Sequence, residues 1–180
     1  MGRNPYCFLS TERLGFHHWS LTDLPFALAL WTNPEVTRLL GGPFSPQQVE
    51  ERLRGEIALQ ESCGVQYWPI LLRATGDDVG CAGLRPYQQA AGIYELGFHL
   101  LPAWWNQGLA QEAARAVIHY AFSTVGARGL FAGHHPENAA SRRVLEKLGF
   151  RYTHDELYGP TGLMHPSYHL ERPGGREPPA

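Results

Sequence analysis

The segment from residue 92 to residue 149 constrains the fold most, because it alternates strand and helix patterns twice. Residues 92–101 show the two-residue alternation of a strand, and residues 107–124 repeat apolar side chains at the spacing of an amphipathic helix. A short strand pattern at 130–133 and a second amphipathic helix ending at Gly149 follow. Strands joined through helices in this way predict a mixed α/β sheet with crossover connections.

The other segments supply the rest of this sheet. Strands are predicted at residues 13–19, 67–73, 79–85, 150–154 and 164–171. Helices are predicted at 24–31, with Asp23 as the expected N-cap, and from Pro46 to about Gln60, where Ser45 is the expected cap. The turn at residues 75–78 is rich in Gly and Asp, so it predicts a hairpin.

Size and composition indicate one globular domain. The 180 residues are 43% hydrophobic and 18% charged, so we expect a single domain at residues 1–172 and a flexible tail at 173–180. The formal net charge of -2 gives no general attraction to nucleic acid or to membranes. Three widely spaced cysteines and the lack of a signal-peptide pattern predict a reduced, cytoplasmic protein. We expect a monomer or a homodimer.

Small residues mark the start of the helix near residue 107. Gly108 and Ala110 allow a ligand to approach the backbone, and the amides of Gln107 to Ala110 could surround a diphosphate without a lysine. An ordinary helix start explains these residues equally well. The segment alone leaves both readings open.

Three motifs together resemble one protein superfamily. They are WWNQGLAQEA, the later PENAASRRVLEKLGF and the opening TERLGFHHWSLTDL. Their order and spacing resemble the GNAT superfamily of N-acetyltransferases, and specifically its RimJ/RimL-type branch, over about residues 10–171. The resemblance implies the GNAT fold, an α/β fold with a mixed, mostly antiparallel twisted sheet of about six to seven strands and helices on both faces.

The resemblance also implies acetyl-CoA as the co-substrate. The family's diphosphate loop falls on residues 105–110, and its pantetheine site falls on strand backbone near residues 98–101. Asn138 matches an asparagine that contacts the pantetheine arm, and it equally fits a helix cap. Arg143 could reach the phosphates, although a solvated helix face is the alternative. The expected cofactor-binding residues are Phe98, Leu100, Gln107, Gly108, Leu109, Ala110, Asn138 and Arg143.

Acetyl transfer needs a base for the amine, and Glu95 is the first candidate. Partial burial within a strand would raise its pKa and make it a better base near neutral pH. His99, on the same predicted strand face, is the second candidate.

Leu145 occupies the position of the family's usual tyrosine acid, so Ser141 is the replacement candidate. Tyr152 and Tyr158 are the alternatives. Support of the helix cap is the other explanation for Ser141.

The acceptor is left open by the sequence. A protein or peptide N-terminal α-amine is the first reading, and a small amine such as an antibiotic, a polyamine or an amino acid is the second. The third reading is a catalytically silent acyl-CoA-binding module. His165 and His169 are four residues apart in a strand pattern, too far apart to share a metal ion, so no metal is expected.

Overall fold

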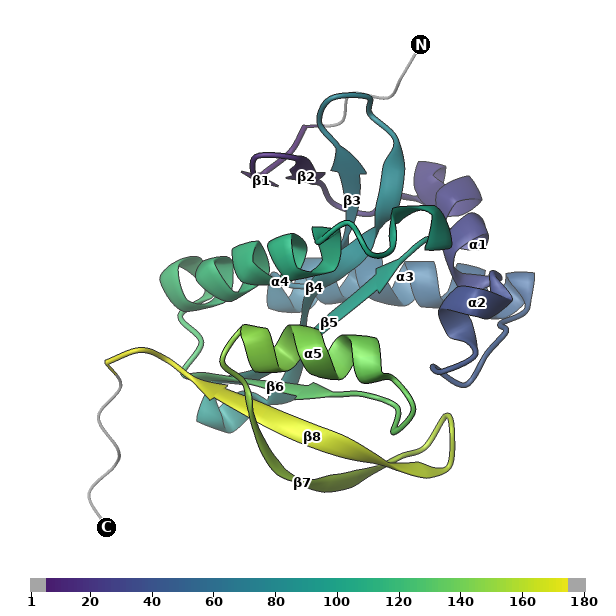
Figure 1. Ribbon diagram of the computed structural model, residues 1–180. Coiled ribbons are helices and arrows are strands. Elements are labelled where there is room, and N and C mark those ends of the chain that lie inside the picture. The colour runs from purple at the N-terminus through teal and green to yellow at the C-terminus, as the bar shows by residue number, and fades with distance from the viewer. Residues whose placement is uncertain (1–5, 175–180) are drawn as a thin grey trace.

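The computed structural model describes residues 6–174 as one sheet with helices packed on it (Figure 1). The predicted tail at 173–180 lies outside the described residues, apart from Pro173 and Gly174. The strands are β1 Leu9–Ser10, β2 Leu14–Phe16, β3 Tyr67–Leu72, β4 Asp78–Gln88, β5 Ile93–Leu100, β6 Gly129–Gly133, β7 Arg151–Tyr158 and β8 Leu163–Glu171. The helices are α1 Leu24–Trp31, α2 Pro34–Thr37, α3 Pro46–Cys63, α4 Leu109–Tyr120 and α5 Ala139–Lys147.

The sheet has eight strands in the order β1-β2-β3-β4-β5-β6-β8-β7. All neighbours pair antiparallel except β5 and β6, which are parallel. This confirms the mixed, mostly antiparallel architecture. The additional strand is β1, which has two residues and is too short to show an alternating pattern.

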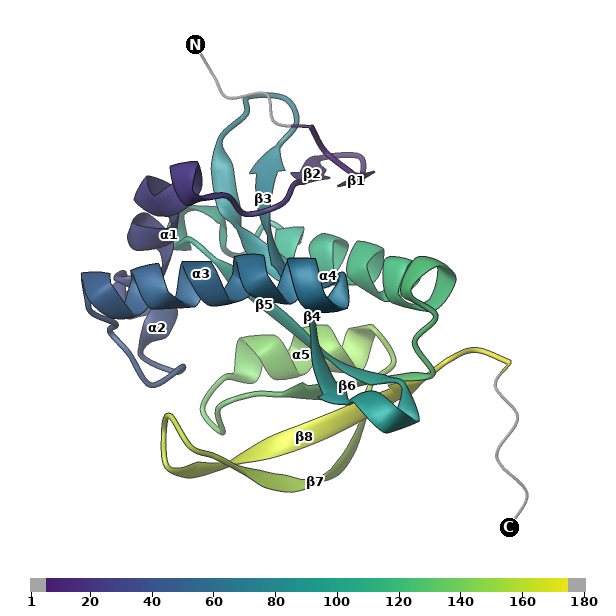
Figure 2. The same cartoon turned by 180° about the vertical axis from the view of Figure 1, so that it is seen from behind.

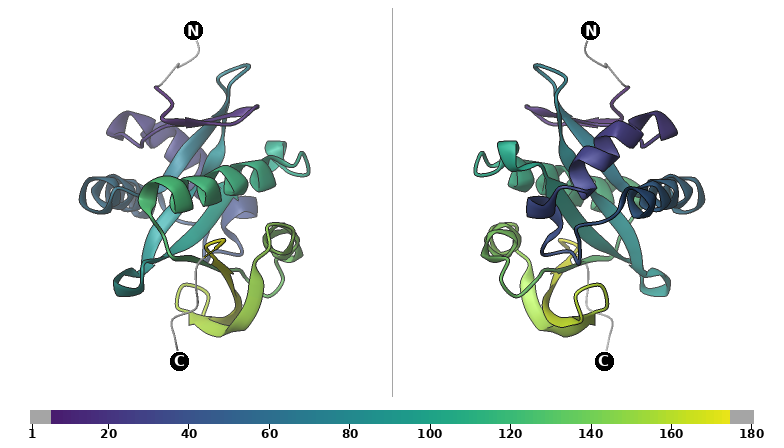
Figure 3. Two further views of the ribbon diagram at one scale, coloured as in Figure 1. Left: turned by 90° about the vertical axis from the view of Figure 1, so that its left-hand side faces the viewer. Right: turned by 90° about the vertical axis from the view of Figure 1, so that its right-hand side faces the viewer.

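Helices cover both faces of the sheet, as expected. Helices α4 and α5 lie on the face in front in Figure 1, and α1 and α3 lie on the opposite face, seen in Figure 2. From the side, α3 and α5 flank the strands on opposite sides (Figure 3). Each face has its own core, with Leu96 and Leu109 among the residues of the first and Trp31 and Leu53 among those of the second.

Local signals place two of these helices accurately. Helix α3 begins after Ser45, whose hydroxyl accepts a hydrogen bond from the Gln48 amide at 3.2 Å. Helix α1 has the predicted bounds and Asp23 is its N-cap residue, as expected, but the Asp23 side chain makes no capping hydrogen bond. The Asp23 carboxylate instead accepts from the Ser20 amide at 2.8 Å and the Ser20 hydroxyl at 2.7 Å, because a short 3₁₀ turn precedes α1.

Two features of the described residues concern membranes and metals. No helix within residues 6–174 combines the length and apolar character needed to cross a membrane. Within the same residues, no group of three or more His, Cys, Asp or Glu side chains is arranged to hold a metal ion. Cys7, Cys63 and Cys81 form no disulfide bond within the described residues.

Candidate functional site

The loop before α4 leaves the first turn of the helix uncapped. Helix α4 begins at Leu109, two residues after the predicted start, because Gly108 adopts a left-handed conformation with φ of 76°. Gly108 is the N-cap and has no side chain that could satisfy the first amides. Asn106 also has a positive φ of 59°. The amides of the first helical turn have no partner within the helix and lie at the positive end of its dipole, so they are suited to bind an anion.

Two side chains fix this loop to the end of β5 and to the preceding turn. The Trp105 indole donates a hydrogen bond to the Leu100 carbonyl at 2.8 Å. The Gln107 side chain donates to the Ala103 carbonyl at 2.9 Å, so its amide group is used within the loop. The loop that precedes α4 is thereby held beside the carboxyl end of β5.

A cluster of polar contacts joins the N-terminal segment to the start of α4. Arg13 donates from Nε to Glu112 at 2.6 Å and from Nη1 to the Gln107 carbonyl at 3.0 Å. The Thr11 hydroxyl and the Arg13 backbone amide also donate to the Glu112 carboxylate. One guanidinium therefore contacts both the loop and the first turn of α4. The sequence reading identified the TERL motif that contains Thr11 and Arg13 but not this contact.

Strands β5 and β6 separate beyond residue 95. Their paired residues are Ile93 with Gly129, Tyr94 with Leu130 and Glu95 with Phe131. β5 continues to Leu100, so its last part extends past this pairing. The backbone of Phe98 and Leu100 lies in this part, while their side chains pack in the core beneath α4. A strand edge without a neighbour can hydrogen bond to an extended, amide-containing ligand.

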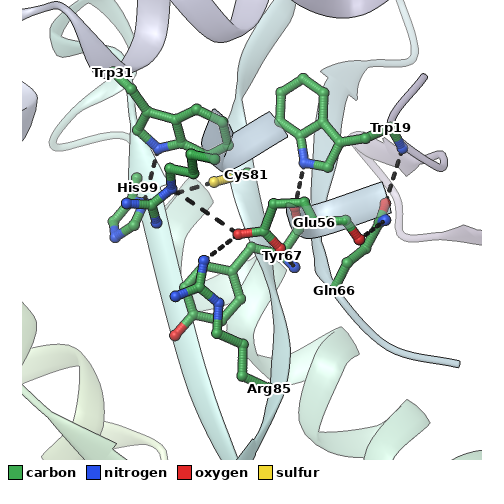
Figure 4. Close-up of polar contacts among 9 residues, drawn as sticks. Trp19, Trp31, Glu56, Gln66, Tyr67, Cys81, Arg85 and His99 are labelled. Carbon is green, nitrogen blue, oxygen red and sulfur yellow. Dashed lines mark hydrogen bonds and ion pairs between the residues drawn. The ribbon is translucent and has the colours of Figure 1, made fainter. Parts of the chain in front are cut away.

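As predicted, Glu95 and His99 share one face of β5, and this face is turned toward α3 (Figure 4). Gly97 lies between them, and the Tyr67 ring fills the space above it, since a Cβ on Gly97 would lie 2.2 Å from the Tyr67 hydroxyl oxygen. The Tyr67 ring also makes an edge contact with the His99 ring, with centroids 5.7 Å apart (Figure 4). The tyrosine therefore occupies the surface between the two candidate bases.

Burial raises the pKa of the Glu95 carboxyl above its usual range. The charge of Arg85 and a hydrogen bond from Tyr67 oppose part of this rise, and the charge of Glu156 adds to it. Burial also keeps the pKa of the Tyr67 hydroxyl well above its ordinary value, so the hydroxyl stays protonated and can donate. A carboxylate with a raised pKa is a better proton acceptor near neutral pH.

His99 lies in a setting that keeps its ring neutral. Burial, together with the charges of Arg52 and Arg85, lowers the pKa of His99 well below its usual value. Its Nδ1 accepts a hydrogen bond from the Trp31 indole at 3.3 Å, so the proton of the neutral ring is on Nε2. Of the two candidate bases, only Glu95 has a pKa that its surroundings raise.

A buried carboxylate organises this face of the sheet. Glu56 of α3 is buried and accepts from the Tyr67 backbone amide at 2.8 Å, and it forms an ion pair with Arg85 (Figure 4). The Arg85 guanidinium lies over the Tyr67 ring, 4.3 Å from its centroid. The sequence reading missed Glu56, Tyr67 and Arg85, because they come from separate elements and form no motif along the chain.

The remaining predicted residues lie at the start of α5, on the other face of the sheet. The Asn138 side chain caps α5 by accepting from the Ser141 amide at 3.0 Å. Ser141 is half-buried, and Arg143 is exposed and donates to the Ala139 carbonyl at 3.1 Å. Leu145 is buried in the core. The predicted capping role of Asn138 is confirmed. Its predicted contact with the pantetheine arm stays a prediction.

The structure thus brings the predicted residues together as two groups. The start of α4 and the start of α5 lie on one face of the sheet, and Glu95 and His99 lie on the other. The pairing of β5 with β6 ends at Glu95. A hollow of about 430 Å³ near the other end of α4, lined by Arg115 and Phe122 among others, contains none of the predicted residues. The geometry therefore offers an uncapped helix start and an unpaired strand segment near one end of β5, with a carboxyl group of raised pKa on the opposite face.

Comparison with known proteins places the chain in a family. Residues 13–151 match the acetyltransferase (GNAT) domain. The chain is 32% identical over 146 residues to the "Uncharacterized N-acetyltransferase YoaA" of Bacillus subtilis (strain 168), covering 79% of this chain and 82% of that protein. The protein belongs to the GNAT acetyltransferase family.

Solved structures support the fold. A GNAT-family acetyltransferase from Bacillus anthracis superposes with a TM-score of 0.79 at 23% identity, covering 91% of this chain and 97% of that one. RimL, a ribosomal L7/L12 alpha-N-protein acetyltransferase solved in complex with coenzyme A, superposes with a TM-score of 0.78 at 15% identity. That match covers 92% of this chain and 98% of RimL.

Proposed function

We propose that the protein transfers an acetyl group from acetyl-CoA to a primary amine. Two features that lie together at the carboxyl end of β5 carry the proposal. One is the uncapped start of α4, and the other is the last part of β5, which is no longer paired with β6. The amides of Gln107, Gly108, Leu109 and Ala110 would hold the diphosphate, and the backbone of Phe98 and Leu100 would hold the pantetheine arm. Bound acetyl-CoA supplies the acetyl thioester. Asn138 and Arg143 flank this path from α5.

Glu95 acts as the base in this proposal. The attacking amine must lose a proton, and Glu95 is the candidate whose surroundings raise the pKa. His99 stays neutral, so its proposed part is to direct its Nε2–H toward the acceptor. Ser141 is the proposed donor of a proton to the departing thiolate, because none of the side-chain hydrogen bonds within residues 6–174 uses its hydroxyl.

We place the chain in the RimJ/RimL-type branch and propose an N-terminal α-amine as the first acceptor class. The three sequence motifs support this placement, as does the superposition on RimL. The second hypothesis is a small-molecule amine as the acceptor. The third is a protein that binds acyl-CoA without catalysing transfer. The same assay distinguishes all three.

The assay measures CoA release from acetyl-CoA with a panel of N-terminal peptides and small amines. We expect turnover with at least one amine, and a decrease in kcat of about 10² to 10⁴ for Glu95→Gln with little change in the acetyl-CoA KM. Saturable acetyl-CoA binding without turnover on any amine would favour the silent module. Unchanged turnover in Glu95→Gln would remove Glu95 from the mechanism.

A further inference from the structure

The guanidinium groups of Arg52 and Arg85 both approach the buried carboxylate of Glu56. They lie on the face of the sheet that carries Glu95. Glu56 already receives the Arg85 guanidinium and the Tyr67 amide. Arg52, one turn before Glu56 on α3, lies farther away, with 4.0 Å between its Nε and the nearest carboxylate oxygen. Glu56 is therefore hydrogen bonded to Arg85, whereas Arg52 makes only a longer ion pair with it.

Arg52 is mostly buried, and its Nε is a buried donor without an acceptor in the described part of the chain. Its side chain is 20% exposed, and its Nε is shielded from solvent. Burying a charged donor without an acceptor is costly, so such a group indicates a partner that is bound in use.

Aromatic rings hold the Arg52 guanidinium in place. It lies 4.5 Å from the centroid of the Trp31 ring and 5.9 Å from that of Phe44. Trp31 is the residue whose indole donates to His99. Stacking fixes the plane of a guanidinium and leaves its N–H edge available for a carboxylate, which it can bind through two parallel hydrogen bonds.

Arg52 also lies within electrostatic range of the groups that surround the acceptor. Its charge acts on Glu95, on His99 and on Tyr158 of the β7–β8 hairpin. That hairpin closes against the loop before α3, where a Cβ on Gly41 would lie 2.6 Å from the Pro160 carbonyl oxygen. An amine bound at Glu95 would therefore lie within the electrostatic range of Arg52.

We propose that Arg52 binds a carboxylate carried by the acceptor, so that the preferred substrates are amines with a carboxylate attached through a short chain. This inference rests on the proposed acetyl transfer and specifies its substrate class. A free amino acid and a peptide that begins with an acidic residue both provide this chemistry. The two sources are separated by the substrates used in the test.

The test compares matched substrates that differ in one charge. β-Alanine is compared with β-alaninamide, and the peptide Asp-Ala-Ala amide with Asn-Ala-Ala amide. In the wild type we expect kcat/KM to be about tenfold or more higher for the carboxylate member of at least one pair. Preference within the first pair identifies a free amino acid, and preference within the second identifies a peptide. Ratios near one in both pairs would overturn the proposal.

Substitution of Arg52 assigns the preference to this side chain. Arg52→Met should bring the preferred ratio close to one while leaving the KM for acetyl-CoA unchanged. The control is Arg54→Met, because Arg54 is on the same helix, is 59% exposed and pairs with Glu50 at the surface. It should keep the wild-type ratio. Arg52→Lys, which keeps the positive charge, should keep part of the preference. A ratio that Arg52→Met leaves unchanged would contradict the assignment.

The design separates this inference from the proposed function. Turnover on every amine with no charge preference would overturn the carboxylate site and leave acetyl transfer intact. If no amine is turned over, calorimetry with two matched product pairs, added to the protein with CoA, decides the matter: N-acetyl-β-alanine with its amide, and N-acetyl-Asp-Ala-Ala amide with N-acetyl-Asn-Ala-Ala amide. Preferred binding of the carboxylate member of either pair supports the site, and equal or absent binding within both pairs overturns it.

Discussion

The Arg13 guanidinium and the Glu112 carboxylate lie 2.6 Å apart and join the N-terminal segment to the first turn of α4. The same guanidinium donates to the Gln107 carbonyl at 3.0 Å. Arg13 therefore restrains the two backbone segments that flank Gly108. In the proposed function these segments supply the amides that bind the diphosphate, so the contact positions the binding loop.

Removing the Arg13 side chain should weaken acetyl-CoA binding more than it weakens the fold. Arg13 is 45% exposed, so solvent screens the ion pair and its loss should cost roughly 1 kcal/mol or less of unfolding free energy. Displacement of the loop should raise the acetyl-CoA KM about tenfold in Arg13→Met. Steady-state kinetics and thermal unfolding measure the two effects. A KM equal to that of the Arg54→Met control would contradict the positioning role.

Glu112 should contribute to stability in a pH-dependent way. Burial by itself raises the pKa of Glu112, but hydrogen bonds from Thr11 and Arg13 outweigh it, so the net pKa is below the usual carboxylate range. A lowered pKa in the folded state stabilises the protein above the unfolded-state pKa, and this contribution is lost as the pH falls through the lowered value.

The difference in melting temperature between wild type and Glu112→Gln should therefore be largest near neutral pH. It should shrink as the pH falls below about 4, where the carboxylate becomes protonated in both states. Thermal melts at a series of pH values measure this difference. A difference that stays constant down to the lowest pH would show that the charge of Glu112 contributes nothing.

Tyr67→Phe should move the pH dependence of turnover without removing the ring that covers Gly97. The Tyr67 hydroxyl donates to Glu95 and lowers its pKa, so its loss should raise that pKa further. The acidic limb of the kcat/KM profile should then shift to higher pH. An unshifted limb in Tyr67→Phe would mean that Glu95 is not the group that the profile reports.

Gly97→Ala should destabilise the fold because the Tyr67 ring occupies the space of the added methyl group. The new Cβ would lie 2.3 Å from the Tyr67 Cζ, so the ring or the strand must move. We expect a loss of about 1–3 kcal/mol in unfolding free energy, measured by urea denaturation. In a Tyr67→Ala background the same change should cost much less. Equal costs in both backgrounds would rule out this contact as the cause.

The sequence predicted well the elements whose signals are local. Residues 24–31 form α1 with the predicted bounds, and Ser45 caps α3, because apolar periodicity and capping residues act within a few positions. The start of α4 shifted from 107 to 109, since the left-handed conformation of Gly108 ends the loop there. The two-residue strand β1 is defined by its partner and not by its own pattern.

The candidate site was only partly predictable, because several of its residues are distant in the sequence and meet only in the folded chain. Glu95 and His99 follow from the alternation of one strand, so their shared face could be expected. Tyr67, Glu56 and Arg52 reach the same face from β3 and α3, and only the folded chain brings them together. The motif TERL could be identified in the sequence, but the contact between Arg13 and Glu112 joins residues 99 positions apart.

The most direct test of the account is a calorimetric titration of two matched glycine variants with acetyl-CoA. Gly108 and Gly126 have nearly the same backbone conformation, with φ of 76° and 75°, and neither would bring a new Cβ into a clash. Gly108→Ala and Gly126→Ala should therefore lose similar stability, about 1–2 kcal/mol each. Only Gly108 lies at the proposed diphosphate loop. The account predicts saturable binding by the wild type and by Gly126→Ala, and binding at least about tenfold weaker by Gly108→Ala. Equal affinity in the two variants, or no saturable binding by the wild type, would contradict it.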